Sequence, residues 1–203
     1  MTLDRFRNTA DRVTSPFVTA ADRAGLTPNS VSVLGLIAAA FAGLCFYFAM
    51  EAHWLYAAGG VFVALNGLLD LIDGALARKQ QVSSRAGDLL DHVIDRYADV
   101  ILIAGLAAGV QQYAFGFLAV TGVLLTSYLG TQTQAIGLER EYGGLLGRAD
   151  RLALIGLIGF VMFVYSDPVY GYTVVGWLLI IFAVVGHLTA IQRFFGAWRS
   201  LNE

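Results

Sequence analysis

The chain carries little charge. Only 14% of its 203 residues are Asp, Glu, Lys or Arg, whereas 57% are hydrophobic, and a soluble domain of ordinary composition has about 25% charged residues. Together with a mean hydropathy of +0.66, this shortage excludes an ordinary soluble domain and predicts an integral membrane protein. The formal net charge of -2 gives no broad positive field, so we expect the lipid bilayer as a partner and no nucleic acid.

Cysteine is almost absent as well. The single cysteine, Cys45, lies in an apolar run and cannot form an intramolecular disulfide, so we interpret it as a packing residue. The first residues also lack the short apolar core of a secretory signal, and no cleaved segment is expected.

The apolar residues are gathered into long uncharged stretches, and a helix needs about 20 such residues to span a bilayer. The longest stretch, 100–138, is nearly twice that length and is interrupted by Gln111, Gln112 and Tyr113, which predicts two helices with a turn between them. The sequence therefore predicts an all-α integral membrane protein with six transmembrane helices, at about 30–50, 55–77, 88–110, 115–137, 149–166 and 171–194.

The basic residues indicate how these helices are oriented. All 13 Lys and Arg residues lie in or near the N-terminal segment, the connections between the second and third and between the fourth and fifth helices, or the C-terminal end. Because cationic connections stay on the cytoplasmic side, both termini are expected there. We therefore expect a multi-pass protein of the cytoplasmic membrane, with these basic segments facing the cytoplasm.

Residues 1–24 have a different pattern from the six-helix domain, 25–203. Their apolar residues recur at steps of three and four, with charged residues between them: Leu3, Phe6, Ala10, Val13 and Phe17. This stripe predicts an amphipathic helix in the cytoplasmic interface, with a kink or break at Pro16; the alternative is a solvated charged tail. Thr27, Pro28 and Ser30 then supply capping residues for the first spanning helix.

Four aspartates lie where the second predicted helix ends and the third begins. Asp70 and Asp73 are three residues apart and Asp91 and Asp95 are four apart, so each pair shares one helix face. With a rise of about 1.5 Å per residue, both pairs reach the cytoplasmic third of the bilayer. The sequence therefore predicts that four carboxylates meet at this depth.

Clustered carboxylates in a membrane need a compensating cation, because they repel one another and are costly to desolvate. Oxygen ligands without Cys or His at ligand spacing favour Mg2+ or Mn2+ over zinc. Such ions in turn indicate phosphate chemistry, in which two metals hold the oxygens around a transferring phosphorus.

The pattern D-x2-D-G-x2-A-R-x8-G-x3-D-x3-D over residues 70–95 resembles the signature of the CDP-alcohol phosphatidyltransferase family. The resemblance implies a homodimer with a polar cavity open to the cytoplasm, which moves a phosphatidyl or archaetidyl group from a CDP-linked lipid to a small alcohol acceptor and releases CMP. It implies that two Mg2+ or Mn2+ ions are bound by Asp70, Asp73, Asp91 and Asp95, with Asp95 also the general base. It further implies that the CDP-lipid pocket is lined by Gly74, Ala77, Arg78 and Gly87.

The acceptor is indicated by two arginines that open the fifth predicted helix. Arg148 and Arg151 are three residues apart and suit a phosphate. They resemble a two-arginine segment of family members that use inositol phosphate. Those members also carry a lysine and further cations after a Ser-Tyr pair, whereas here Ser127 and Tyr128 are followed by uncharged residues. Glycerol phosphate therefore stays open as the acceptor, as does serine if the arginines serve only as positive-inside anchors.

Two further aspartates border the motif: Asp99 is expected to support the cluster through hydrogen bonds, and Asp88 to lie at a solvated helix start. Other classes of membrane protein also place carboxylates in the bilayer. An intramembrane cation or proton transporter should show polar residues continuing through the outer half, which the first, second and sixth predicted helices lack. A membrane prenyltransferase has aspartates at a different spacing, and a purely structural membrane protein has no reason to keep the charge cluster.

Overall fold

The structure is a computed structural model that describes residues 7–82, 84–138, 144 and 146–202, with side chains from residue 14 onward. These residues are almost wholly helical, and their only paired extended residues are the isolated bridge between Val169 and Tyr172, so the predicted all-α fold is confirmed. The helices are α1 (Arg7–Arg23), α2 (Pro28–Phe48), α3 (Leu55–Gln80), α4 (Arg85–Gly109), α5 (Tyr113–Ala135), α6 (Arg148–Val164) and α7 (Val174–Asn202).

Helices α2 to α7 begin within three residues of the six predicted starts. Four of them, α2, α3, α5 and α7, are long and apolar enough to cross a membrane. The predicted end of the last helix at 194 was wrong, because α7 continues to Asn202.

The ends of the helices follow from local capping chemistry. At the start of α2, the Thr27 side chain accepts a hydrogen bond from the Ser30 N–H, and the Ser30 hydroxyl is within bonding distance of the Thr27 N–H. Pro28 follows the cap, where its missing N–H costs nothing. Between α4 and α5 the chain turns at Gln111, which has a φ of 59°. This turn lies where the polar interruption predicted it.

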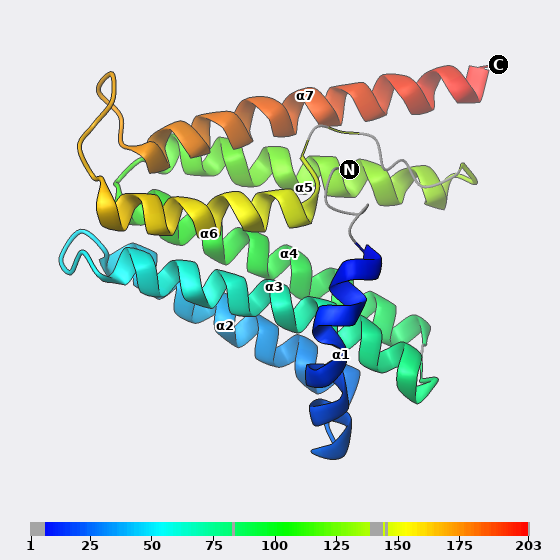
Figure 1. Cartoon of the computed structure of the whole chain (residues 1–203). Helices are drawn as coiled ribbons and strands as arrows, with labels where there is room; N and C mark the ends of the chain where they lie inside the picture. The colour runs from blue at the N-terminus through cyan, green and yellow to red at the C-terminus, as the bar shows by residue number, and fades with distance from the viewer. Residues whose placement is uncertain (1–6, 83, 139–143, 145, 203) are drawn as a thin grey trace.

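The helices pack as two neighbouring groups in Figure 1: α2 lies against α3 and α4, and α5 lies against α7. α6 packs on α3, and α4 packs on α5. Glycine allows the closest approach, since a Cβ at Gly109 in α4 would collide with the Phe46 carbonyl oxygen of α2. Phe46, Leu102 and Leu106 fill the core beside this contact.

α1 crosses the bundle near the end where α3 finishes and α4 begins (Figure 1). Val18 packs with Val31, Ile72 and Leu76. The helix passes through Pro16 without ending, which excludes a break there, and the alternative of a kink stays a prediction. Of the predicted apolar stripe, Leu3 and Phe6 lie outside the described residues and the side chains of Ala10 and Val13 are not described.

Two polar contacts tie the C-terminal end of α1 to α3. The Lys79 ammonium lies 3.0 Å from Asp22 Oδ2, and the Gln80 amide donates to Asp22 Oδ1 at 2.9 Å. Phe17, the described member of the stripe, is instead 50% exposed. α1 therefore packs on α3 through the face that carries Val18 and leaves Phe17 on the surface.

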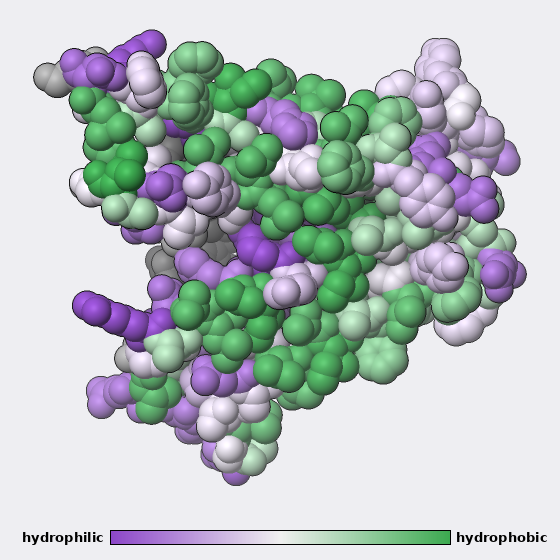
Figure 2. Space-filling model, turned by 180° about the vertical axis from the view of Figure 1, so that it is seen from behind, coloured by the Kyte–Doolittle hydropathy of each residue, from purple (hydrophilic) through white to green (hydrophobic). Residues whose placement is uncertain are grey.

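Hydrophobic side chains cover the middle of the molecule in Figure 2, whereas hydrophilic ones gather toward its two ends. The exposed apolar residues come from several helices and include Phe41, Val61, Leu125 and Ile181. Such a large apolar surface fits lipid and not water. At the end where α3 finishes, the surface in Figure 2 is hollowed, with hydrophilic residues inside the hollow.

Candidate metal and phosphate site

Three of the four motif aspartates meet between α3 and α4. Carboxylate oxygens of Asp70, Asp91 and Asp95 all lie within 4.8 Å of one another, and each side chain is partly buried. The spacing on each helix places Asp91 and Asp95 on one face, and the packing of the bundle turns this face toward Asp70. We call these three residues the carboxylate cluster.

Asp73 lies beside the carboxylate cluster with a different partner. It is 7% exposed, and its Oδ2 accepts a hydrogen bond of 2.7 Å from the Ser32 hydroxyl of α2. Asp73 remains within electrostatic range of Asp70 and Asp91. Ser32 was not identified from the sequence, because no spacing rule connects residues 41 positions apart.

The two arginines of α6 bind aspartates of α3 and α4. Arg148 makes two contacts, from Nη1 to Asp70 Oδ1 at 2.7 Å and from Nη2 to Asp95 Oδ1 at 2.9 Å. Arg151 donates from Nη2 to Asp99 Oδ2 at 2.8 Å. The sequence placed both arginines at the start of this helix as a site for the acceptor phosphate, and their ion pairs with the aspartates were not predicted.

The start of α6 explains how these arginines reach so far inward. In Figure 1, α6 begins well inside the bundle, short of the end where α3 finishes. The Gly147 N–H donates to Asp150 Oδ2 at 2.9 Å and closes the first turn. A cation in the first turn opposes the helix dipole, so Arg148 and Arg151 depend on the carboxylates opposite them.

Arg96 also lies beside these aspartates, although from the sequence it was interpreted only as one of the basic residues that mark the cytoplasmic side. Its Nη1 donates to the Ser127 hydroxyl of α5, and its Nη2 lies 3.4 Å from Asp99 Oδ2 and 3.8 Å from Asp95 Oδ2. The available signal was the three-residue spacing of Arg96 and Asp99, which favours an ion pair on one helix face.

The residues expected to line the CDP pocket lie at the last turns of α3 and the first turn of α4. A Cβ added to Gly74 would lie 3.6 Å from Arg78 Nη1, and one added to Gly87 would lie 3.3 Å from the Ser84 hydroxyl. Neither would meet the backbone of a neighbouring helix within 4 Å. The packing of the chain therefore does not require glycine at Gly74, which suits a surface that a ligand approaches closely.

Gly74→Leu is expected to raise the KM for CDP-lipid by about tenfold or more, the scale of a 1.4 kcal/mol loss. In the CDP pocket that the motif implies, the added side chain would occupy space of the nucleotide, while turnover at saturating donor would change less. Initial rates over a series of CDP-lipid concentrations measure this. Gly196→Leu is the matched control, because nothing lies within 4 Å of a Cβ at that position of α7. Equal donor KM values in the two variants would contradict the placement.

The carboxylate cluster fits a hard divalent cation. Its donors are oxygens only, they converge on one region, and each is partly shielded from water. These are the ligand properties that Mg2+ and Mn2+ prefer. The residues present therefore suit such an ion.

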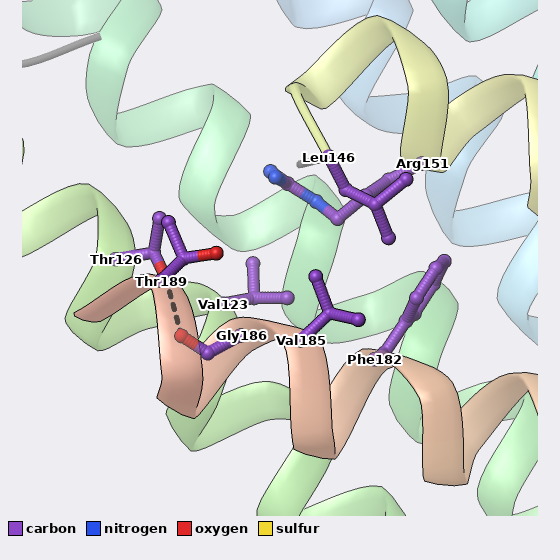
Figure 3. Close-up of a pocket in the computed structure, with 8 residues that line it drawn as sticks. All are labelled: Val123, Thr126, Leu146, Arg151, Phe182, Val185, Gly186 and Thr189. Carbon is purple, nitrogen blue, oxygen red and sulfur yellow. Dashed lines mark hydrogen bonds between the residues drawn. The ribbon is translucent and has the colours of Figure 1, made fainter. Parts of the chain in front are cut away.

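A small cavity lies on another side of Arg151, between α5 and α7. Figure 3 shows the Arg151 side chain reaching toward a space lined by Thr126, Leu146 and Thr189. Thr126 donates its hydroxyl hydrogen to the Gly186 carbonyl at 2.8 Å. Arg151 is therefore next to both a buried carboxylate and a partly polar cavity.

The model of one protein family, described as CDP-alcohol phosphatidyltransferase, matches residues 25–189. The chain belongs to this family. It is an enzyme, a CDP-alcohol phosphatidyltransferase, and the resemblance drawn from residues 70–95 is confirmed. A transporter and a membrane prenyltransferase are not supported.

Two curated relatives are named for inositol phosphate. The chain is 29% identical to the archaetidylinositol phosphate synthase of Methanothermobacter thermautotrophicus, over 98% of this chain and 96% of the relative. It is 34% identical to the phosphatidylinositol phosphate synthase of Mycobacteroides abscessus, over 73% of this chain and 69% of the relative.

Solved structures of the phosphatidylinositol phosphate synthase of Mycobacterium tuberculosis have the same fold. The structure in complex with manganese and citrate matches with a TM-score of 0.76 and 27% identity, covering 91% of this chain and 88% of the other. The structure with CDP-DAG bound matches with the same TM-score and identity, covering 92% and 94%.

Proposed function

We propose that this enzyme transfers a phosphatidyl group, or its archaeol counterpart, from a CDP-linked lipid to inositol phosphate and releases CMP. The observation that carries the choice of acceptor is the placement of two arginines at the first turn of α6, with Arg148 on the carboxylate cluster and Arg151 on the neighbouring Asp99. A helix start with two guanidinium groups suits a phosphate. The relatives named above, an archaetidylinositol phosphate synthase and a phosphatidylinositol phosphate synthase, support this choice over glycerol phosphate.

We assign the binding of two Mg2+ or Mn2+ ions to Asp70, Asp73, Asp91 and Asp95. Bound metal would neutralise the diphosphate of the donor and make its phosphorus more electrophilic. Gly74, Ala77, Arg78 and Gly87 would hold the cytidine and diphosphate at the ends of α3 and α4. The Mycobacterium tuberculosis enzyme was solved in complex with manganese, which supports a divalent metal as the cofactor.

The chemical step is a direct displacement. A hydroxyl oxygen of the acceptor attacks the phosphorus on the lipid side of the diphosphate, the bond from this phosphorus to the bridging oxygen breaks, and CMP leaves with the electron pair. The hydroxyl proton passes to Asp95, the general base. Asp95 is partly buried between Arg148 and Arg96, and these cations hold its carboxylate oxygens in place beside Asp70 and Asp91.

The arrangement in the membrane completes the proposal. All six helices α2 to α7 would span the bilayer with both termini cytoplasmic, and α1 would lie in the cytoplasmic interface. The distribution of Lys and Arg supports this orientation, and it turns the hollowed end of the molecule toward the cytoplasm, where water-soluble acceptors are. The active enzyme would be a homodimer.

Arg151→Ala is expected to raise the acceptor KM by about 10- to 100-fold, because it removes charge-assisted hydrogen bonds worth roughly 1.5 to 3 kcal/mol. The KM for CDP-lipid should stay near the wild-type value. Arg199→Ala removes an exposed arginine of α7 and is the matched control. Arg148→Ala is expected to change metal binding as well as acceptor binding, since Arg148 contacts Asp70 and Asp95, and it is therefore a less selective test. A wild-type acceptor KM in Arg151→Ala would make this arginine a topological anchor.

The acceptor is tested by measuring CMP release from CDP-diacylglycerol with inositol phosphate, glycerol phosphate, inositol and serine in separate reactions. Inositol phosphate is expected to give the highest kcat/KM, and inositol without phosphate should react poorly. Faster reaction with glycerol phosphate would support the phosphate site but would replace inositol phosphate by glycerol phosphate as the proposed acceptor. Faster reaction with serine would remove the phosphate site from the proposal.

A further inference from the structure

Asp99 is a buried carboxylate outside the motif, and two guanidinium groups converge on one of its oxygens. The side chain is 2% exposed and lies one turn further along α4 than Asp95. Its Oδ2 accepts from Arg151 Nη2 at 2.8 Å and lies 3.4 Å from Arg96 Nη2. Asp99 thus connects α4 to the first turn of α6.

Arg96, one turn before Asp99 on α4, contacts the Asp99 carboxylate on the side toward α5. This guanidinium is held by the Ser127 hydroxyl and lies between Asp95 and Asp99. The charges therefore alternate along one row: Arg148, Asp95, Arg96, Asp99 and Arg151. Each charge in the row therefore has an opposite neighbour, which offsets part of the cost of burying it.

Among the described residues, Asp99 is the one hydrogen-bond partner of the Arg151 side chain. This arginine side chain is 9% exposed, and its Nε is buried without a hydrogen-bond partner among the described residues. It also lies in the first turn of α6, where the helix dipole repels a cation. The hydrogen bond to Asp99 is what offsets this repulsion and sets the direction of the guanidinium, beside the cavity of Figure 3.

We infer that Asp99 is a positioning residue: held by Arg96, it orients Arg151 toward the acceptor phosphate and thereby sets acceptor affinity. This inference rests on the proposed function, in which Arg151 binds that phosphate. Among the described residues, Asp99 reaches the carboxylate cluster only through Arg96, so its loss is expected to change acceptor affinity much more than metal or donor affinity.

The first test compares Asp99→Asn, Asp99→Glu and Asp88→Asn. Asp88 is the matched control, because it lies exposed in the first turn of the same helix. Asp99→Asn is expected to raise the KM for inositol phosphate by about tenfold or more, the scale of one lost charge-assisted hydrogen bond. Its KM for CDP-lipid and its affinity for Mn2+ should stay within about twofold of wild type, and Asp99→Glu should recover part of the acceptor affinity.

The second test remains available if Asp99→Asn does not fold. It uses Arg151→Gln and the double variant Asp99→Asn/Arg151→Gln. Both lack the Arg151 charge, so neither contains a buried guanidinium that has lost its carboxylate partner. If Asp99 acts through Arg151, these two variants have the same acceptor KM, because the second change removes nothing further. A clearly higher KM in the double variant would overturn the inference.

In Asp99→Asn, equal increases in the KM values for acceptor and donor, or loss of Mn2+ binding, would also overturn the inference. Either result would show that Asp99 has a general structural role. The proposed acceptor is tested separately by the wild-type enzyme. If inositol phosphate does not react but another phosphorylated alcohol does, the same ratios between variants are measured with that alcohol. If only an unphosphorylated alcohol reacts, the inference fails with the phosphate site.

Discussion

Asp91→Asn is expected to lower turnover by about a hundredfold to a thousandfold or more, the cost of removing a major electrostatic group from a reaction centre. Asp91 belongs to the carboxylate cluster with Asp70 and Asp95. An amide at this position keeps the size of the side chain but loses its charge, so the cluster would hold a divalent cation weakly. CMP release at saturating donor and acceptor measures the effect.

Asp167→Asn is the matched control for this variant. Asp167 is exposed, in the connection between α6 and α7 at the other end of the bundle, and its loss should not change turnover. Helix content and thermal stability without metal should be similar in both variants. Near-normal turnover in Asp91→Asn would show that the cluster does not bind the catalytic metal.

Removal of divalent metal is expected to abolish CMP release completely, and Mg2+ or Mn2+ should restore it. Without metal, the carboxylate cluster has no divalent cation to bind the diphosphate, and its negative charge repels the donor. Activity is measured after treatment with a chelator and again after each metal is returned in excess.

Thermal unfolding gives a second measurement of the same site. A metal that binds only the folded chain stabilises it, by about 2.7 kcal/mol at a hundred times its Kd. Mn2+ should therefore raise the Tm of the wild-type protein, and raise that of Asp91→Asn much less. Full turnover in the presence of chelator, or an equal rise in Tm in both proteins, would argue against a metal at Asp91.

Most of the fold could be predicted because membrane helices follow directly from the length of apolar stretches. The turn at Gln111 was visible as a polar interruption, and Thr27 and Pro28 marked the start of α2. The end of α7 was missed because Arg193 and Arg199 were interpreted as the cytoplasmic boundary. The structure instead continues the helix through both, with Arg193 buried and donating to the Thr126 carbonyl at 2.6 Å.

The candidate site could be predicted only in part. The spacing of Asp91 and Asp95 places them on one face of a helix, and the matching motif placed Asp70 opposite. Contacts between distant residues follow no such spacing. Arg151 and Asp99 are 52 positions apart, and their ion pair depends on how deeply α6 begins in the bundle, which hydropathy does not show.

The most direct test of the reaction uses CDP-diacylglycerol labelled with 32P at the lipid-side phosphorus, incubated with the purified enzyme, Mn2+ and inositol phosphate. Attack at that phosphorus predicts that all transferred label enters a new phospholipid, in a one-to-one ratio with unlabelled CMP. Label appearing in a water-soluble nucleotide, or CMP release without a labelled lipid product, would contradict phosphatidyl transfer by this chain.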